Sequence, residues 1–206
     1  MAKAKKLKKQ GPPTLAQFRR RRENDYADRP WKLPIFSYGV NTNIDQVKLR
    51  CPDWNGRWTP AMLPDYRMSF SKQYPRTQQT YCNIEASPGD YVHGCLLWLD
   101  PTSFRALDRF EGYPVHYQRV KLHAPSGQPC WAYISDHKGK GAPSVEYYES
   151  VIDGLKMCGA HDDYLRRVIL DAAERFERQE AQADALFSEP EYLPAKYRMR
   201  PQVAMW

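Results

Sequence analysis

Residues 91–112 read YVHGCLLWLDPTSFRALDRFEG, and this stretch decides the fold. Its first part, Tyr91 to Leu99, is almost entirely apolar or aromatic, a composition typical of a strand buried on both faces. Asp100 and Pro101 then predict the start of a helix, because an N-cap carboxylate followed by proline is a favoured opening. Gly112 predicts the end of that helix. Together with the other strands and the two C-terminal helices described next, this strand and short helix indicate an α+β domain.

The segments on either side supply further strands and helices. The mainly apolar segment 34–38 is typical of a short strand that ends at Gly39. The composition of residues 87–90, Ser-Pro-Gly-Asp, predicts a turn. We expect strands over residues 34–38, 63–70, 81–86, 91–99, 116–122 and 130–134. Ser144 is a candidate N-cap for a later helix, and Asp162 opens a longer one with regular apolar spacing. We therefore predict a small mixed β-barrel-like sheet, with a short helix after its central strand and two C-terminal helices.

The positive charge of the chain is concentrated at its N-terminus. The 206 residues carry a net charge of +7, and residues 1–30 alone hold ten Lys or Arg against three Asp or Glu, so the remaining residues are neutral overall. Residues 1–30 also lack hydrophobic periodicity, which predicts a flexible basic arm. Such an arm is either a solubilising tail or a segment that contacts nucleic acid or an acidic protein surface.

The folded domain is expected over residues 31–187, followed by an extended tail over residues 188–206 in which Pro, Tyr and Arg follow no period. No apolar run approaches the roughly 18 residues that span a bilayer, and no signal-peptide pattern opens the chain, so we expect no membrane contact and a cytoplasmic location. The five cysteines are scattered and form no C-x-x-C pair, which predicts reduced, buried thiols. We predict no metal site.

Two places in the sequence are candidates for chemistry. Glu111 follows Phe110 at the end of the expected helix, where apolar neighbours would raise the pKa of its carboxyl group toward that of a general base. The alternative is an ordinary solvated carboxylate, although a helix C-terminus is an unfavourable place for an anion. In residues 38–41, Tyr-Gly-Val-Asn, a glycine directly after a strand allows a sharp turn that directs successive N–H groups at one anion.

These two places belong to an ordered set of short motifs. The set consists of Y-G-V-N at 38–41, R-C-P at 50–52, P-G-D-Y-V-H-G at 88–94, L-D-R-F-E-G at 107–112, H-Y-Q-R-V at 116–120, W-A-Y at 131–133 and P-S-V-E-Y at 143–147. Each motif is loose, but their order is specific. Over residues 33–172 the chain resembles the gamma-glutamylcyclotransferase-like family.

The resemblance implies a cofactor-independent enzyme with a single cavity and a small gamma-glutamyl substrate. Members of this family cleave gamma-glutamyl amides and release 5-oxoproline together with an amine or amino acid. The resemblance assigns the acid/base role to Glu111. It assigns substrate binding to the turn and to three later tyrosines, that is, to Tyr38, Gly39, Val40, Asn41, Tyr117, Tyr133 and Tyr147. For each of the three later tyrosines, packing in the core is the alternative.

One departure from the family pattern leaves an alternative open. The family has a serine where this chain has Val40, so a hydroxyl group is replaced by an apolar one. If the position acts through its backbone N–H, little is lost, and the retained Glu111 favours an active enzyme. The alternative is a catalytically altered family member that serves as a binding or structural subunit, with residues 1–30 contacting nucleic acid or an acidic partner. A third possibility is that the arm delivers an active enzyme to a polyanionic substrate.

Overall fold

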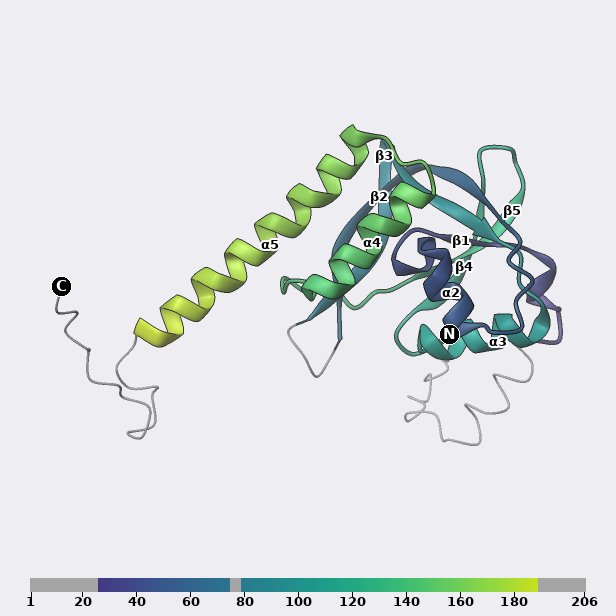
Figure 1. Ribbon diagram of the computed structural model, residues 1–206, viewed down its shortest axis with the longest axis horizontal. Coiled ribbons are helices and arrows are strands. Elements are labelled where there is room, and N and C mark those ends of the chain that lie inside the picture. The colour runs from purple at the N-terminus through teal and green to yellow at the C-terminus, as the bar shows by residue number, and fades with distance from the viewer. Residues whose placement is uncertain (1–25, 75–78, 189–206) are drawn as a thin grey trace, which may run out of the picture.

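The computed structural model describes residues 26–74 and 79–188 of the chain (Figure 1). Most of the predicted basic arm and nearly all of the predicted C-terminal tail therefore lie outside the described residues. The described part begins within the predicted arm, at Tyr26, whose ring stacks on Trp31 with centroids 6.5 Å apart. None of the helices in this part combines the length and apolar composition needed to cross a membrane.

A five-stranded mixed sheet forms the centre of the domain. Its strands are β1 (Ile35–Ser37), β2 (Trp58–Gln73), β3 (Thr80–Leu97), β4 (Gln118–His123) and β5 (Pro129–Ile134), in the spatial order β2-β3-β1-β5-β4. The short strand β1 lies in the middle, antiparallel to β3 and parallel to β5. All three of its residues are buried, as expected for a central strand. The predicted α+β class is confirmed.

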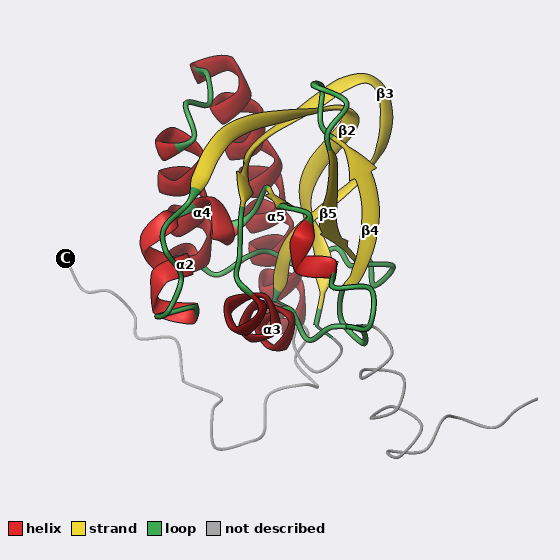
Figure 2. Cartoon of the chain, turned by 90° about the vertical axis from the view of Figure 1, so that its right-hand side faces the viewer, coloured by secondary structure: helices red, strands yellow, loops and turns green. Residues whose placement is uncertain are grey.

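The sheet curves strongly, with helices gathered along one side of it (Figure 2). Two contacts outside the regular strand pairing connect β2 and β3 to the segment that follows β5. Lys72 at the end of β2 forms an isolated bridge with Lys138, which follows β5. The side chain of Asn83 in β3 donates to the carbonyl oxygen of Ser135 at 2.8 Å and accepts from its N–H at 3.0 Å. These contacts give the sheet its barrel-like form.

The predicted break between two strands at residues 87–90 is wrong. β3 continues through this segment, because Ala86 pairs with Tyr66 and Tyr91 pairs with Pro64 of the same partner strand. Residues 87–90 therefore bulge opposite Asp65, whose side chain accepts a hydrogen bond from the Gly89 N–H at 2.9 Å. The turn chemistry is locally present, since Gly89 has a φ of 81°. The chain then resumes pairing instead of reversing, and the strands expected separately are parts of one long β2–β3 hairpin.

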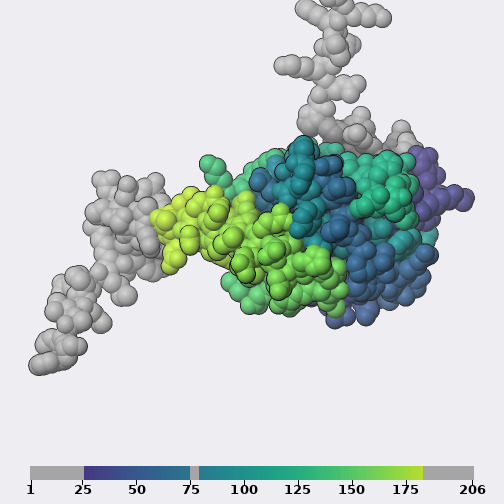
Figure 3. Space-filling view, turned by 90° about the horizontal axis from the view of Figure 1, so that it is seen from above, coloured from purple at the N-terminus to yellow at the C-terminus, as the bar shows by residue number. Residues whose placement is uncertain are grey.

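The helices cover the sheet and are capped where the sequence predicts. α3 (Pro101–Phe110) begins at Asp100, whose carboxylate accepts from the backbone N–H groups of Thr102 and Ser103. α4 (Val145–Met157) begins at Ser144, whose hydroxyl accepts from the backbone N–H of Tyr147. α5 (Asp162–Ser188) is the long helix, and its far end projects beyond the body of the domain (Figure 3).

Three short elements were not predicted. They are α2 (Ile44–Arg50) and the 3₁₀ helices Pro30–Lys32 and Val40–Thr42. The 3₁₀ helix Val40–Thr42 and α2 follow β1 directly, so the segment after Gly39 is helical and not an open turn. Asn43 separates the two helices and caps α2 by accepting from the Gln46 N–H.

The apolar core fills both sides of this arrangement. One cluster lies between the sheet and the helices α4 and α5, and a second lies beneath α2 and α3. The carboxylate of Asp171 ties α5 to the sheet, because it accepts from the Phe70 N–H of β2 at 2.8 Å. All five cysteines are buried and unpaired, so the predicted burial of the thiols is confirmed.

Candidate active site

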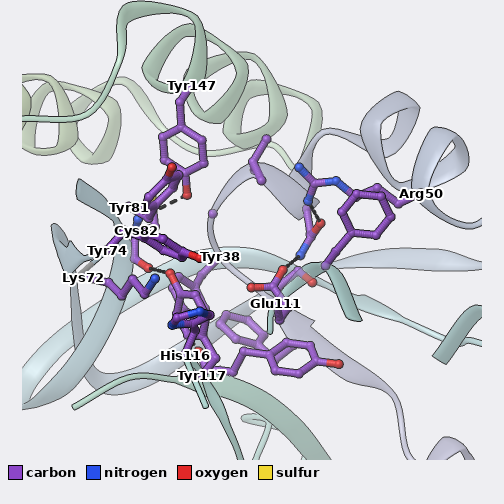
Figure 4. Close-up of a pocket in the computed structure, with 17 residues that line it drawn as sticks. Tyr38, Arg50, Lys72, Tyr74, Tyr81, Cys82, Glu111, His116, Tyr117 and Tyr147 are labelled. Carbon is purple, nitrogen blue, oxygen red and sulfur yellow. Dashed lines mark hydrogen bonds between the residues drawn. The ribbon is translucent and has the colours of Figure 1, made fainter. Parts of the chain in front are cut away.

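A cavity of about 260 Å³ opens where the segment after β1 meets the end of α3 (Figure 4). Residues of α2, β2, β3, β5 and α4 complete its wall. Every residue that the sequence proposes for the site lines this cavity, namely Tyr38, Gly39, Val40, Asn41, Glu111, Tyr117, Tyr133 and Tyr147. Segments separated by more than a hundred residues in the sequence thus line one cavity.

Glu111 occupies the C-terminal end of α3. Its N–H donates to the Leu107 carbonyl at 2.9 Å, and Gly112 then reverses the chain with a φ of 62°, which glycine adopts without strain. The side chain is partly buried in the cavity wall. Burial raises the pKa of the Glu111 carboxyl above its ordinary value, and a hydrogen bond from Asn41 together with the positive charges of Arg50 and Lys72 opposes this rise. The carboxylate is therefore desolvated but not isolated.

Asn41 connects Glu111 to a cation. Its Nδ2 donates to Oε1 of Glu111 at 2.6 Å, while its Oδ1 accepts from Nη1 of Arg50. Because a guanidinium group can only donate, Arg50 fixes the amide so that its N–H₂ end faces the carboxylate. The guanidinium group also lies over the ring of Phe110, 5.3 Å from its centroid. Arg50, Asn41 and Glu111 therefore form a connected row along one side of the cavity.

Gly39 lies where there is no room for a side chain. A Cβ atom there would lie 2.9 Å from Cβ of Cys82, so only glycine allows the segment after β1 to approach β3 this closely. The first N–H groups of the following 3₁₀ helix, those of Val40 and Asn41, have no hydrogen-bond acceptor among the described residues. Val40 itself lines the cavity with an apolar side chain. Free amides beside a carboxylate can bind an anionic or polarised oxygen.

The tyrosines use their hydroxyl groups within the protein. Tyr38 donates to the Tyr133 carbonyl, Tyr117 donates to the Cys82 carbonyl at 2.6 Å, and Tyr147 accepts from the Cys82 N–H at 3.2 Å. Tyr133 donates to Oδ1 of Asp108 at 2.7 Å. Burial raises the pKa of all four hydroxyls well above its usual value, so they remain neutral. Among the described residues none of these hydroxyls bonds to Glu111, and they shape the wall around it.

Several cavity residues were not among the site residues that the sequence analysis proposed. They include Arg50, Lys72, Tyr74, Tyr81, Phe110 and His116. Arg50 stood within a quoted motif, but nothing indicated that α2 would carry it to Asn41. A lysine in a strand normally faces solvent, so the burial of Lys72 had no local signal. In the described part of the chain, no group of three or more His, Cys, Asp or Glu side chains is placed to hold a metal ion.

Comparison with known proteins gives a family and a fold. The family described as gamma-glutamyl cyclotransferase, AIG2-like, matches residues 35–151. A solved structure named gamma-glutamyl cyclotransferase is 23% identical with a TM-score of 0.56, and the match covers 66% of this chain and 85% of that one. An uncharacterised protein from Homo sapiens is 24% identical with a TM-score of 0.54 and the same coverage.

A third structural neighbour is YkqA from Bacillus subtilis, which is 17% identical with a TM-score of 0.54. The match covers 66% of this chain but only 52% of YkqA. At these identities the structural likeness concerns the fold. No curated protein sequence matches the chain.

Proposed function

Because the chain belongs to the AIG2-like gamma-glutamyl cyclotransferase family, we propose that it cleaves gamma-glutamyl amides and releases 5-oxoproline with an amine or amino acid. The observation that carries this proposal is the partly buried carboxylate of Glu111, held by Asn41 at 2.6 Å beside free backbone amides in one cavity. That arrangement suits a reaction in which one group both removes and returns a proton.

The proposed reaction needs one proton carrier and no second substrate. The Glu111 carboxylate takes a proton from the α-ammonium group, and the freed amine attacks the γ-carbonyl carbon of the same molecule. The new C–N bond closes the five-membered ring, and Glu111 returns the proton to the leaving nitrogen as the original amide C–N bond breaks. The ring nitrogen gives up its second proton, so that it becomes the amide N–H of 5-oxoproline and the amine leaves as its ammonium ion. Intramolecular attack with good orientation corresponds to an effective concentration on the order of 10⁵ M or more, so the site need only hold the substrate folded.

The remaining cavity groups have supporting roles in this proposal. The N–H groups of Val40 and Asn41 are available for the α-carboxylate or for the oxygen of the attacked γ-carbonyl. In that role Val40 acts through its backbone, so the missing serine hydroxyl is not required. The neutral tyrosines restrict the space in which the gamma-glutamyl chain can bend.

A substrate screen tests the proposal directly. The purified chain is incubated with gamma-glutamyl amino acids, gamma-glutamyl amines and glutathione, and 5-oxoproline is measured by mass spectrometry. We expect release from at least one of these classes. If none releases 5-oxoproline, the proposal fails, and the alternative of a binding or structural subunit with the same fold is favoured.

Replacing Asn41 by alanine is expected to move the acidic limb of the pH–activity profile to higher pH. Asn41 donates to the charged form of Glu111 and thereby lowers the pKa of that carboxyl; without it, the pKa rises further above its ordinary value. A general base must be deprotonated, so activity at a fixed pH on the acidic limb falls. The measurement is kcat/KM as a function of pH.

Asn55 provides a matched control, since it lies exposed in a loop outside the cavity. The same change to alanine there is expected to leave the limb where it is. A profile that stays in place for Asn41→Ala would show that the hydrogen bond does not control the protonation of the catalytic group.

A further inference from the structure

Lys72 is a buried cation without a counter-ion among the described residues. Lys72 is only 3% exposed, and its ammonium group lies 4.9 to 5.2 Å from the ring centroids of Tyr74, Tyr81 and Tyr117. No carboxylate forms an ion pair with it in the described part of the chain. A buried charge is normally paired, and aromatic faces replace lost hydration only in part. Lys72 lines the cavity, which leaves room for a partner that arrives with a ligand.

His116 adds a second unused polar group to the same wall. Its Nδ1 is buried and has no hydrogen-bond partner among the described residues. Its ring lies 4.6 Å from that of Tyr74 and packs so closely on Gly112 that a Cβ atom there would come within 2.5 Å of it. The ring is therefore held in place. In the tautomer with a proton on Nδ1, it offers a hydrogen-bond donor.

These two groups lie apart from the row formed by Arg50, Asn41 and Glu111. Figure 4 shows Lys72 and His116 on one side of the cavity and Arg50 on the other, with Glu111 between them. The positive charge of Lys72 still acts on Glu111, so the two lie within the same cavity and not in separate sites. The cavity thus has a second region built to receive a negatively charged or hydrogen-bond-accepting group.

The proposed reaction decides which part of the substrate reaches that region. The α-ammonium group must meet Glu111, and the α-carboxylate is bound to the same carbon, so both stay near Glu111 and the free amides of Val40 and Asn41. Two methylene groups separate this carbon from the γ-carbonyl, and the leaving group extends beyond it. The leaving group is therefore the part that can extend toward Lys72 and His116.

We propose that Lys72, assisted by His116, binds a carboxylate of the leaving group, so that the substrates are gamma-glutamyl amino acids or peptides and not gamma-glutamyl amines. This inference rests on the proposed cyclotransferase function and adds the substrate class. A carboxylate would give Lys72 its counter-ion and accept from Nδ1 of His116. An unsubstituted amine leaves both groups unpaired in a buried place, which is a strong basis for discrimination.

The test uses two substrates that differ only by the carboxylate, gamma-glutamyl-alanine and gamma-glutamyl-ethylamide. We expect kcat/KM of the unmodified protein to favour gamma-glutamyl-alanine by about 10- to 100-fold, the range of one charge-assisted interaction. Lys72→Met is expected to bring this ratio close to one. The variant also removes a charge that acts on Glu111, but that effect is common to both substrates and cancels in the ratio. Lys121→Met, on the exposed surface of β4, is the matched control and should keep the ratio.

Two kinetic outcomes overturn the proposal. One is an unmodified protein that treats both substrates alike. The other is an equal loss for both substrates in Lys72→Met, which would place Lys72 against the gamma-glutamyl part instead of the leaving group.

A binding measurement separates this proposal from the proposed function. The Glu111→Gln variant is titrated with both compounds by calorimetry, with and without Lys72→Met. Tighter binding of gamma-glutamyl-alanine that depends on Lys72 supports the subsite even if the unmodified protein releases no 5-oxoproline, in which case only the proposed reaction fails. Equal binding of the two compounds, or binding of neither, overturns the subsite.

Discussion

Replacing Glu111 by glutamine is expected to lower kcat for 5-oxoproline release by about 10³-fold or more, with little change in the fold. A positioned acid/base group typically contributes about 10²- to 10⁴-fold, and here one carboxylate serves both the deprotonation and the reprotonation step. Glutamine has the same shape and can still accept the hydrogen bond that Asn41 donates at 2.6 Å. The variant therefore removes the proton carrier and keeps the packing.

The measurement is steady-state release of 5-oxoproline, together with urea unfolding to establish that the variant is folded. Glu146→Gln is the matched control, because Glu146 is an exposed carboxylate on α4 directly before the cavity residue Tyr147. It should retain activity close to that of the unmodified protein. Unchanged turnover in Glu111→Gln would remove Glu111 from the mechanism and contradict the proposed reaction at its central step.

Features fixed by a few neighbouring residues could be predicted from the sequence. The caps at Asp100 and Ser144 depend on side chains that reach N–H groups two or three residues away, and both are present in the structure. The glycine that ends α3 likewise acts locally. The bulge at residues 87–90 could not be predicted, because turn chemistry gives the local conformation but not the strand with which the chain pairs afterwards.

The candidate site divides in the same way. Gly39 and Glu111 stand out in the sequence because a glycine after a strand and a carboxylate among apolar residues are unusual. Arg50 and Lys72 are charged residues in a helix and a strand, where charged residues are common. Only the folded structure shows that α2 and β2 place them in the cavity wall. Tyr26 shows the limit most clearly: it lies in the segment predicted to be a flexible arm, yet its hydroxyl donates to the buried carboxylate of Asp108.

Replacing Asp108 by asparagine is expected to lower the free energy of unfolding by about 3–5 kcal/mol, the typical cost of removing one partner of a buried ion pair. Asp108 is 2% exposed, and its Oδ1 lies 3.6 Å from Nε of Arg119, which is itself enclosed by aromatic rings. Tyr26 and Tyr133 donate to the same carboxylate. The loss of the negative charge leaves the guanidinium group buried beside neutral partners.

Urea unfolding of the single and double variants tests this account. If the lost stability of Asp108→Asn comes from the unpaired guanidinium group, the same change should cost less in an Arg119→Met background. The double variant should then have a higher free energy of unfolding than the sum of the two single effects implies. Asp153→Asn, at an exposed position on α4, is the control and should change stability by less than about 0.5 kcal/mol. A cost below about 1 kcal/mol for Asp108→Asn, or strict additivity with Arg119→Met, would mean that the charge of Asp108 does not stabilise the fold.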